Sequence, residues 1–160
     1  MKNNDTIRTS TNSFLTSIAT IGFLGYIPFA PGTFGSLFAL GLFLLTNLPL
    51  YAHFALILAG TVVGIYASTV AEKILNEKDS KKIIIDEFIG FYVSALYLPK
   101  TWEFAVAAFL LFRFFDILKP LFIAKLEKTL SNGLGIMADD ILAGIYTNIV
   151  LQSWVLIFKA

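Results

Sequence analysis

The chain has 160 residues, of which 57% are hydrophobic and only 14% are charged, and its net charge is +1. A typical soluble domain carries about 25% charged residues, and a soluble fold of this size cannot hide so much apolar surface. The near-neutral charge also argues against nucleic-acid binding, which requires a basic excess or a basic stripe. Composition therefore predicts a single-domain, all-α membrane protein over residues 1–160.

Residue usage limits the chemistry that is open to the chain. There is no cysteine and the only histidine is His53, so disulfides, thiolate sites and cysteine nucleophiles are excluded. A zinc site of the usual His and Cys type cannot be built either. A bound metal would therefore have to accept oxygen ligands, which points to magnesium, manganese or calcium.

The N-terminal region has the charge and hydropathy pattern of a signal peptide, because Lys2 and Arg8 precede the apolar stretch 14–30. The small-x-small cleavage pattern is missing, however, and Pro28 lies where a small residue is expected before cleavage at Ala30. We expect residues 1–12 to be flexible and the stretch 14–30 to be retained as an interfacial or re-entrant helix. Whether this stretch spans, re-enters or lies on the membrane stays open at this stage.

Five further apolar segments predict a polytopic transmembrane bundle of four to five spanning helices. Each has a length close to the 17–25 residues that a spanning helix needs, and lipid requires helices because it offers no partner for unpaired backbone groups. Gly60 and Gly64 form a G-x-x-x-G pair that permits close helix contact, although glycine is also simply common in membrane helices. The segments are 34–51, 53–71, 83–99, 102–118 and 134–158.

Basic residues in the loops predict that the N-terminus is cytoplasmic. With this orientation, the inside regions hold nine basic residues, namely Lys2, Arg8, Lys73, Lys78, Lys81, Lys82, Lys119, Lys125 and Lys128. The outside regions hold two, Lys100 and Lys159. Cytoplasmic loops carry an excess of Lys and Arg, so the opposite orientation would violate this rule.

Five acidic residues then fall at the cytoplasmic ends of three segments. Asp86 and Glu87 lie one turn into the segment 83–99, and Asp116 lies in the last turn of 102–118. Asp139 and Asp140 lie one to two turns into 134–158. A carboxylate at a helix centre in lipid costs about 2.5 to 3.5 kcal/mol, and helix N-termini tolerate single acids. Five together require protons, basic partners or a divalent cation.

Helical spacing adds cations and small residues to these acids. Arg113, Asp116 and Lys119 are three residues apart and share one helix face, which is typical either of a structural ion-pair ladder or of a metal-holding carboxylate flanked by phosphate-binding cations. Gly90 follows Asp86 by four residues, and Gly144 follows Asp140 by four. Such small residues would let the helices approach closely enough for their carboxylates to share an ion.

The stretch 31–36, PGTFGS, is weaker evidence. Its Pro-Gly pair predicts a turn, and Thr33 can act as the N-cap of the helix that follows. Backbone N–H groups at that helix start can bind an anion such as phosphate. Taken alone, the stretch is more typical of a plain turn and cap.

Four stretches together resemble the phosphatidylglycerophosphatase A family. They are PGTFGS (31–36), IIIDEFIG (83–90), FRFFDILKP (112–120) and GLGIMADDILAG (133–144). Their order and spacing are also similar to that family, and the resemblance spans about residues 20–150. It implies a magnesium-dependent phosphatase of the bacterial inner membrane with its site facing the cytoplasm.

The implied reaction converts the phospholipid phosphatidylglycerophosphate into phosphatidylglycerol and inorganic phosphate. The resemblance assigns metal binding to five acids, and catalytic roles to the same acids together with Arg113; the acids are Asp86, Glu87, Asp116, Asp139 and Asp140. It assigns phosphate binding to Arg113, Lys119, Thr33 and Ser36. His53 falls in an outer loop and receives no role. Direct attack by activated water is the simplest mechanism, and an aspartyl-phosphate intermediate is the alternative.

Three other functions fit parts of this pattern. Intramembrane acids also mark ion and proton pathways, but a transporter normally needs polar groups across the whole membrane, and here they gather at one face. An alcohol phosphotransferase of lipids would carry a longer aspartate array than the one present. A non-catalytic scaffold would leave the acids unexplained. The sequence does not define the oligomeric state.

Overall fold

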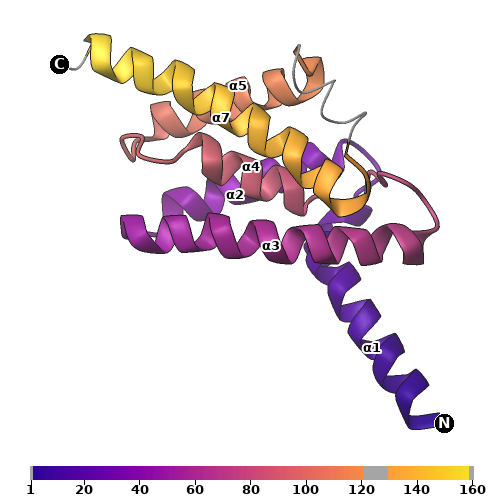
Figure 1. The fold of residues 1–160 in the computed structure, drawn as a ribbon. Helices are drawn as coiled ribbons and strands as arrows, with labels where there is room; N and C mark the ends of the chain where they lie inside the picture. The colour runs from indigo at the N-terminus through magenta and orange to yellow at the C-terminus, as the bar shows by residue number, and fades with distance from the viewer. Residues whose placement is uncertain (1, 121–129, 159–160) are drawn as a thin grey trace.

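The computed structural model describes residues 2–120 and 130–158, with side chains from Ser10 onward within those ranges. The described residues contain helices and loops but no strand (Figure 1). Lys125, Lys128 and Lys159, which contribute to the predicted orientation, lie outside the described residues, as do the side chains of Lys2 and Arg8. The helices are α1 (Lys2–Ala19), the short 3-10 helix η1 (Leu24–Tyr26), α2 (Pro31–Leu45), α3 (Leu50–Leu75), α4 (Ile85–Ser94), α5 (Trp102–Leu118) and α7 (Asn132–Phe158).

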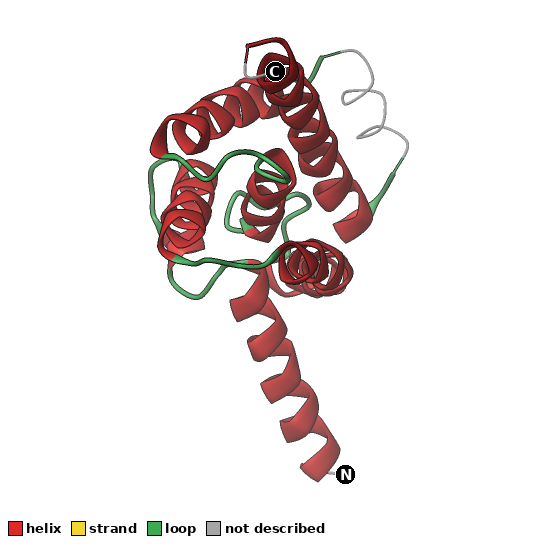
Figure 2. Cartoon of the chain, turned by 90° about the vertical axis from the view of Figure 1, so that its left-hand side faces the viewer, coloured by secondary structure: helices red, strands yellow, loops and turns green. Residues whose placement is uncertain are grey.

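Helix α4 lies at the centre of the bundle and contacts α2, α3, α5 and α7 (Figure 2). Most of its residues are buried, including Phe91 and Tyr92. The surrounding helices expose large apolar side chains on their outer faces, such as Leu58 at 71% and Ile157 at 70%. Such an apolar exterior suits lipid rather than water.

Two helices are long and apolar enough to cross a membrane, α3 with 26 residues and α7 with 27. At 1.5 Å per residue, α2 (15 residues) measures about 22 Å and α5 (17 residues) about 26 Å, against a hydrocarbon core of about 30 Å. The all-helical class of the fold is confirmed. The expected count of four to five spanning helices is not confirmed, because among the described residues only α3 and α7 are both long and apolar enough.

The expected spanning helix over 83–99 is wrong in its length. α4 has only 10 residues, which corresponds to about 15 Å, half the thickness of the hydrocarbon core. The chain leaves the helix at Ala95 and continues through turns to Pro99. Irregular backbone at membrane depth is tolerated where protein buries it, and the central place of α4 provides that cover.

Two side chains of α7 bind carbonyl groups at the end of α4 and just beyond it. The Asn148 amide donates to the carbonyls of Ser94 (3.0 Å) and Leu96 (2.7 Å), and Gln152 donates to the Leu96 carbonyl at 3.0 Å. Because the last carbonyls of a helix lack intrahelical partners, these bonds provide what water would provide elsewhere. They explain why α4 can end inside an apolar segment.

His53 does not lie in an outer loop, as expected, but in the first turn of α3, where it is buried. Its Nε2 is 2.9 Å from the Tyr92 carbonyl oxygen, so the ring donates to this oxygen when Nε2 carries the proton. The ring also meets the Tyr92 side chain edge-on, with centroids 5.3 Å apart. His53 therefore joins α3 to the end of α4.

Glycines allow the helices around α4 to pack closely. A Cβ atom on Gly144 would lie 2.6 Å from the Gly90 carbonyl oxygen, and one on Gly90 would lie 2.8 Å from the Asp140 carbonyl oxygen. The prediction that these two small residues permit close approach is confirmed. Gly60 and Gly64 have the same role on α3, since they pack against Ile89 and Met137.

The N-terminal region consists of α1, a turn and η1 rather than one apolar helix over 14–30. α1 begins at Lys2, within the stretch for which we expected a flexible segment, and projects away from the bundle (Figures 1 and 2). Its C-terminal part packs on α3, through a small core that includes Leu15, Ala19, Ala67 and Ala71.

Replacing Gly144 by alanine should destabilise the bundle, because the added Cβ meets backbone of α4 that cannot move aside. Overpacking of this kind costs about 1–3 kcal/mol, so we expect a lower midpoint of thermal unfolding in detergent. Gly41→Ala is the matched control, since a Cβ there meets nothing within 4 Å. Equal midpoints for the two variants would contradict the close packing of α4 and α7.

Candidate active site

Three helix ends carry the acidic residues into one region. Asp86 and Glu87 occupy the first turn of α4. Asp116 lies in the last turn of α5, and Asp139 and Asp140 lie about two turns into α7. Because α4 packs against both α5 and α7, residues far apart in the sequence are brought together at one end of the bundle.

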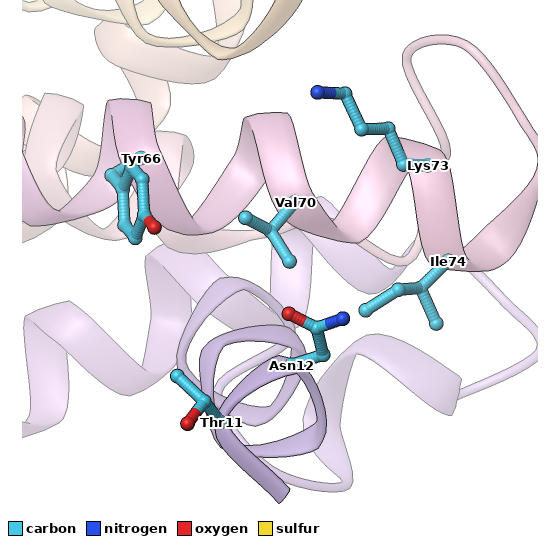
Figure 3. A pocket seen from close by; sticks show the side chains of 6 residues that line it. All are labelled: Thr11, Asn12, Tyr66, Val70, Lys73 and Ile74. Atoms are coloured by element: carbon cyan, nitrogen blue, oxygen red, sulfur yellow. The ribbon is translucent and has the colours of Figure 1, made fainter. Parts of the chain in front are cut away.

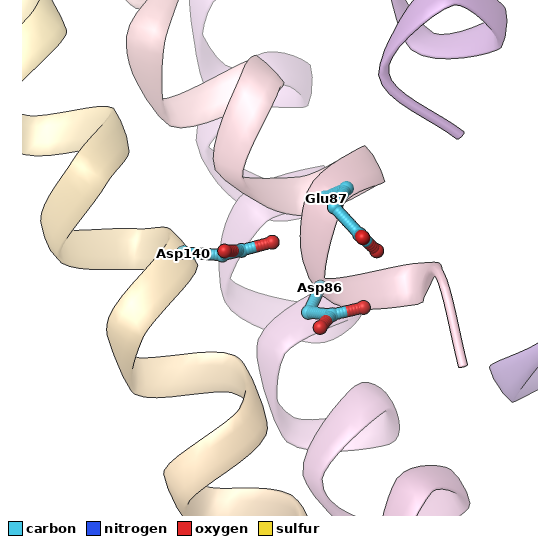
Figure 4. A group of neighbouring side chains, drawn as sticks. All are labelled: Asp86, Glu87 and Asp140. Atoms are coloured by element: carbon cyan, nitrogen blue, oxygen red, sulfur yellow. The ribbon is translucent and has the colours of Figure 1, made fainter. Parts of the chain in front are cut away.

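The tightest part of this region is formed by Asp86, Glu87 and Asp140, called the carboxylate triad below. One carboxylate oxygen from each residue lies within 4.8 Å of the other two. Figure 4 shows the two side chains of α4 and Asp140 of α7 side by side. All three are largely buried, so water does little to weaken their mutual repulsion.

Each residue of the carboxylate triad has one buried oxygen without a hydrogen-bond partner. These atoms are Asp86 Oδ1, Glu87 Oε2 and Asp140 Oδ2. Buried polar groups in native proteins are almost always paired, and exceptions call for an explanation such as an unseen ion. The unpaired oxygens therefore indicate that the triad has the capacity to bind a cation.

Arg113 is a positive side chain beside this triad. Its Nη1 is 2.6 Å from Asp116 Oδ2 and 3.9 Å from Glu87 Oε1. Its Nε is buried and has no hydrogen-bond partner. An arginine fixed on one side by an acid and left with a free donor on the other is suited to bind an oxyanion.

Lys119 forms the second ion pair of the region. Its Nζ lies 2.7 Å from Asp139 Oδ2, which joins the C-cap residue of α5 to α7. The sequence placed Lys119 on one helix face with Asp116, and the structure pairs it with Asp139 of α7. Lys119 has a left-handed backbone, with φ of 42°, and ends the helix.

All five acids nevertheless belong to one electrostatic network. Asp140 is repelled by Asp116, Asp86 and Glu87. Asp86 is also repelled by Asp139, and Glu87 is attracted by Arg113. The described residues thus give five acids two cationic partners, Arg113 and Lys119, which leaves an excess of negative charge.

The start of α2 contributes to this region in a way that the sequence did not indicate. A Cβ on Gly32 would lie 1.9 Å from Glu87 Oε1 and 3.4 Å from Arg113 Nη1, so Gly32 packs directly against the charged side chains. The expected N-cap at Thr33 is wrong, because α2 begins at Pro31 after Ala30. Ser36 is fully buried and donates to the Gly32 carbonyl at 3.0 Å.

The triad fits a hard divalent cation. Carboxylate oxygens are the ligands that magnesium prefers. One oxygen from each triad residue lies within 4.8 Å of the other two, so these residues could hold one such ion. The unpaired oxygens on all three residues support the same conclusion.

The fold and this site define a helical membrane protein with a buried acidic centre at one end of its bundle. Residues 17–155 match the family described as phosphatidylglycerophosphatase A, and the chain belongs to this family of phosphatases. The resemblance seen in the four sequence stretches is thereby confirmed. No solved structure matches the chain significantly.

The chain is similar to three named proteins. Phosphatidylglycerophosphatase A of Haemophilus influenzae is 39% identical over 87% of this chain and 90% of its own length. The Escherichia coli protein of the same name is 35% identical over 80% of this chain and 76% of its own. A protein of Bacteroides thetaiotaomicron named putative phosphatidylinositol-3-phosphatase is 37% identical over 90% of this chain and 97% of its own.

Substituting Gly32 by alanine should disturb the site more than the fold. The added Cβ overlaps the end of the Glu87 side chain, which must move away from the triad. We expect phosphate release from a lipid phosphomonoester to fall at least about tenfold, because small misplacements at a reacting centre are costly. Thermal stability should stay close to that of Gly41→Ala on the same helix, and unchanged activity would show that Gly32 does not position Glu87.

Proposed function

We propose that the protein hydrolyses phosphatidylglycerophosphate to phosphatidylglycerol and inorganic phosphate at the carboxylate triad. The observation that carries this proposal is the set of three buried, partly unpaired carboxylates within a chain of the phosphatidylglycerophosphatase A family. The names of the H. influenzae and E. coli relatives support the substrate. Magnesium is the proposed cofactor.

Asp86, Glu87 and Asp140 would hold the metal, and Asp116 and Asp139 would complete the acidic surroundings. Magnesium bound there would polarise a phosphoryl oxygen and activate a water molecule. Asp139 is held by Lys119 and Asp116 by Arg113, so these two acids would set the position of the neighbouring cations. The triad residues have unpaired oxygens and are free to take the metal.

Arg113 and Lys119 are the proposed phosphate-binding residues. The unpaired Nε of Arg113 can donate to a phosphoryl oxygen, where charge develops as the ester bond breaks. The backbone N–H groups at the start of α2 are unpaired by the helix itself and suit an anion. Thr33 lies in that first turn and stays a candidate there, whereas the Ser36 hydroxyl is already bonded to Gly32.

Attack by water is the proposed route. Each triad residue is then needed for the metal, so none is left to act as a nucleophile, and no cysteine or second histidine exists in the chain. A carboxylate that bonds to phosphorus would have to leave the metal first. An aspartyl-phosphate route remains the alternative mechanism, and it would leave a phosphorylated protein that can be isolated with labelled substrate.

The proposed location is the bacterial inner membrane, with the site on the cytoplasmic side and more than two crossings. Basic residues of the loop 76–84 support this orientation, because Lys78, Lys81 and Lys82 are exposed beside the start of α4 and cytoplasmic loops are rich in lysine. The phosphate group of a lipid at the cytoplasmic surface would lie at the same membrane depth as the triad. A transporter is not favoured, since the family is one of phosphatases.

Phosphate release should depend on a divalent cation and on the triad. Chelator should abolish release from phosphatidylglycerophosphate, and magnesium should restore it. Asp86→Asn and Asp140→Asn should each lower the rate at least about a hundredfold, because each removes a metal ligand. Glu103→Gln, at the far end of α5, is the matched control and should keep the wild-type rate. Full activity in chelator would contradict the metal site.

The same assay with phosphatidylinositol 3-phosphate, the substrate class named for the B. thetaiotaomicron relative, would separate the two lipid activities. We expect a higher kcat/KM for phosphatidylglycerophosphate. A preference for the inositol lipid would overturn the proposed substrate but not the site.

Single cysteines can test the orientation, because the chain has none of its own. Lys78→Cys lies in the loop before α4, and Leu48→Cys lies in the loop between α2 and α3 at the opposite end of α3. A membrane-impermeant thiol reagent should label Leu48→Cys in intact spheroplasts and Lys78→Cys only after lysis. The reverse pattern would overturn the orientation.

A further inference from the structure

A groove separate from the carboxylate triad lies where α1 crosses α3. The described residues that line it are Thr11, Asn12, Tyr66, Val70, Lys73 and Ile74, and its volume is about 370 Å³ (Figure 3). Tyr66, Val70 and Ile74 follow one another at four-residue intervals, so they share one face of α3. The groove therefore runs along the helix rather than across it.

This face of α3 differs from the one that supports the active site. The inward face of the helix carries Gly64, which packs against Met137 of α7, and the buried Ala71. Tyr66 and Lys73, by contrast, are exposed. A molecule in the groove would contact α1 and α3 without reaching the triad on α4 and α7.

The α3 wall of the groove carries the apolar side chains of Val70 and Ile74, and the α1 wall carries the polar side chains of Thr11 and Asn12. Lys73 lies in the last turn of α3 and has no ion-pair partner among the residues that the structure describes. Figure 3 shows the Asn12 amide pointing from α1 toward Val70 and Ile74 of α3. Tyr66 lies seven residues before Lys73, about 10 Å deeper along the helix. A cation above an apolar strip is complementary to a phosphate group above an acyl chain.

The volume fits a head group better than a whole lipid. Liquid water occupies about 30 Å³ per molecule, so 370 Å³ has room for roughly ten non-hydrogen atoms. A phosphoglycerol group has about this size, and its acyl chains would extend past Tyr66 along the lipid-facing side of α3.

We propose that the groove binds the head group of a resident anionic phospholipid, phosphatidylglycerol, with its phosphate on Lys73. This inference rests on the proposed cytoplasmic orientation of the end of α3, which places Lys73 at head-group depth. Cations near a membrane surface favour anionic lipid by about 1 kcal/mol each. The bound lipid would join α1 to α3 beyond their small shared core, and would be retained by the protein rather than hydrolysed.

Native mass spectrometry of the purified full chain in detergent can test this site, with phosphatidylglycerol and phosphatidylethanolamine of identical acyl chains as probes. Wild-type protein should retain phosphatidylglycerol more strongly. Lys73→Gln should weaken this retention about fivefold, which is the effect of about 1 kcal/mol. Val70→Trp, which fills the groove, should weaken retention of both lipids.

Lys78→Gln is the matched control, because it removes the same charge from an exposed loop outside the groove. Equal losses in the Lys73 and Lys78 variants would overturn the proposal and indicate general surface charge, and so would equal retention of the two lipids by the wild type. Asp140→Asn should retain phosphatidylglycerol as the wild type does. Loss in that variant would assign the bound lipid to the active site, whereas failure of the phosphatase assay alone would leave the groove unaffected.

Discussion

Electrostatic repulsion between buried carboxylates is the constraint on which this structure depends. Two carboxylates about 5 Å apart repel by roughly 3 kcal/mol at an effective dielectric of about 20, and the triad contains three such pairs. Arg113 offsets part of this cost because its Nη1 lies 3.9 Å from Glu87 Oε1. Arg113 also pairs with Asp116, and Lys119 pairs with Asp139. A divalent cation would stabilise the three triad carboxylates most. The proposed phosphatase reaction would use the same ion.

The rest of the fold can be understood as the means of holding these acids together. α4 must bring Asp86 and Glu87 into contact with α7, and close packing through Gly90 and Gly144 allows this. α4 is too short to cross the membrane, so its far end needs partners inside the protein. Asn148 and His53 bind carbonyls in its last turn, and Gln152 binds the Leu96 carbonyl just beyond it. Residues distant from the site thereby fix the depth and angle of the helix that carries two of its acids.

Much of the site could be predicted from the sequence because it follows from charge and spacing. The loop lysines indicate which helix ends share a membrane face, and the five acids all fall at those ends. The four-residue spacing from Asp86 to Gly90 and from Asp140 to Gly144 indicates close packing, which the structure contains. These features are local in the sequence, and helix geometry alone predicts their consequences for packing.

Other features depend on tertiary contacts that no local pattern reveals. The segment 83–99 is apolar throughout, so hydropathy cannot show that its helix ends at Ser94, where Asn148 of a distant helix binds the backbone. His53 lies near an expected loop by hydropathy, but its partner is a carbonyl 39 residues away. The sequence around Gly32 predicts only a turn, and the tertiary structure is needed to show that Glu87 lies beside this glycine.

Equilibrium binding of Mn²⁺, followed by electron paramagnetic resonance of the free ion, tests the central claim most directly. Manganese accepts the same oxygen ligands as magnesium. Wild-type protein should bind the ion in a stoichiometric amount, and Asp86→Asn should weaken binding at least about tenfold, while magnesium should compete for the site. Identical binding curves for wild type and variant would show that the carboxylate triad is not a metal site.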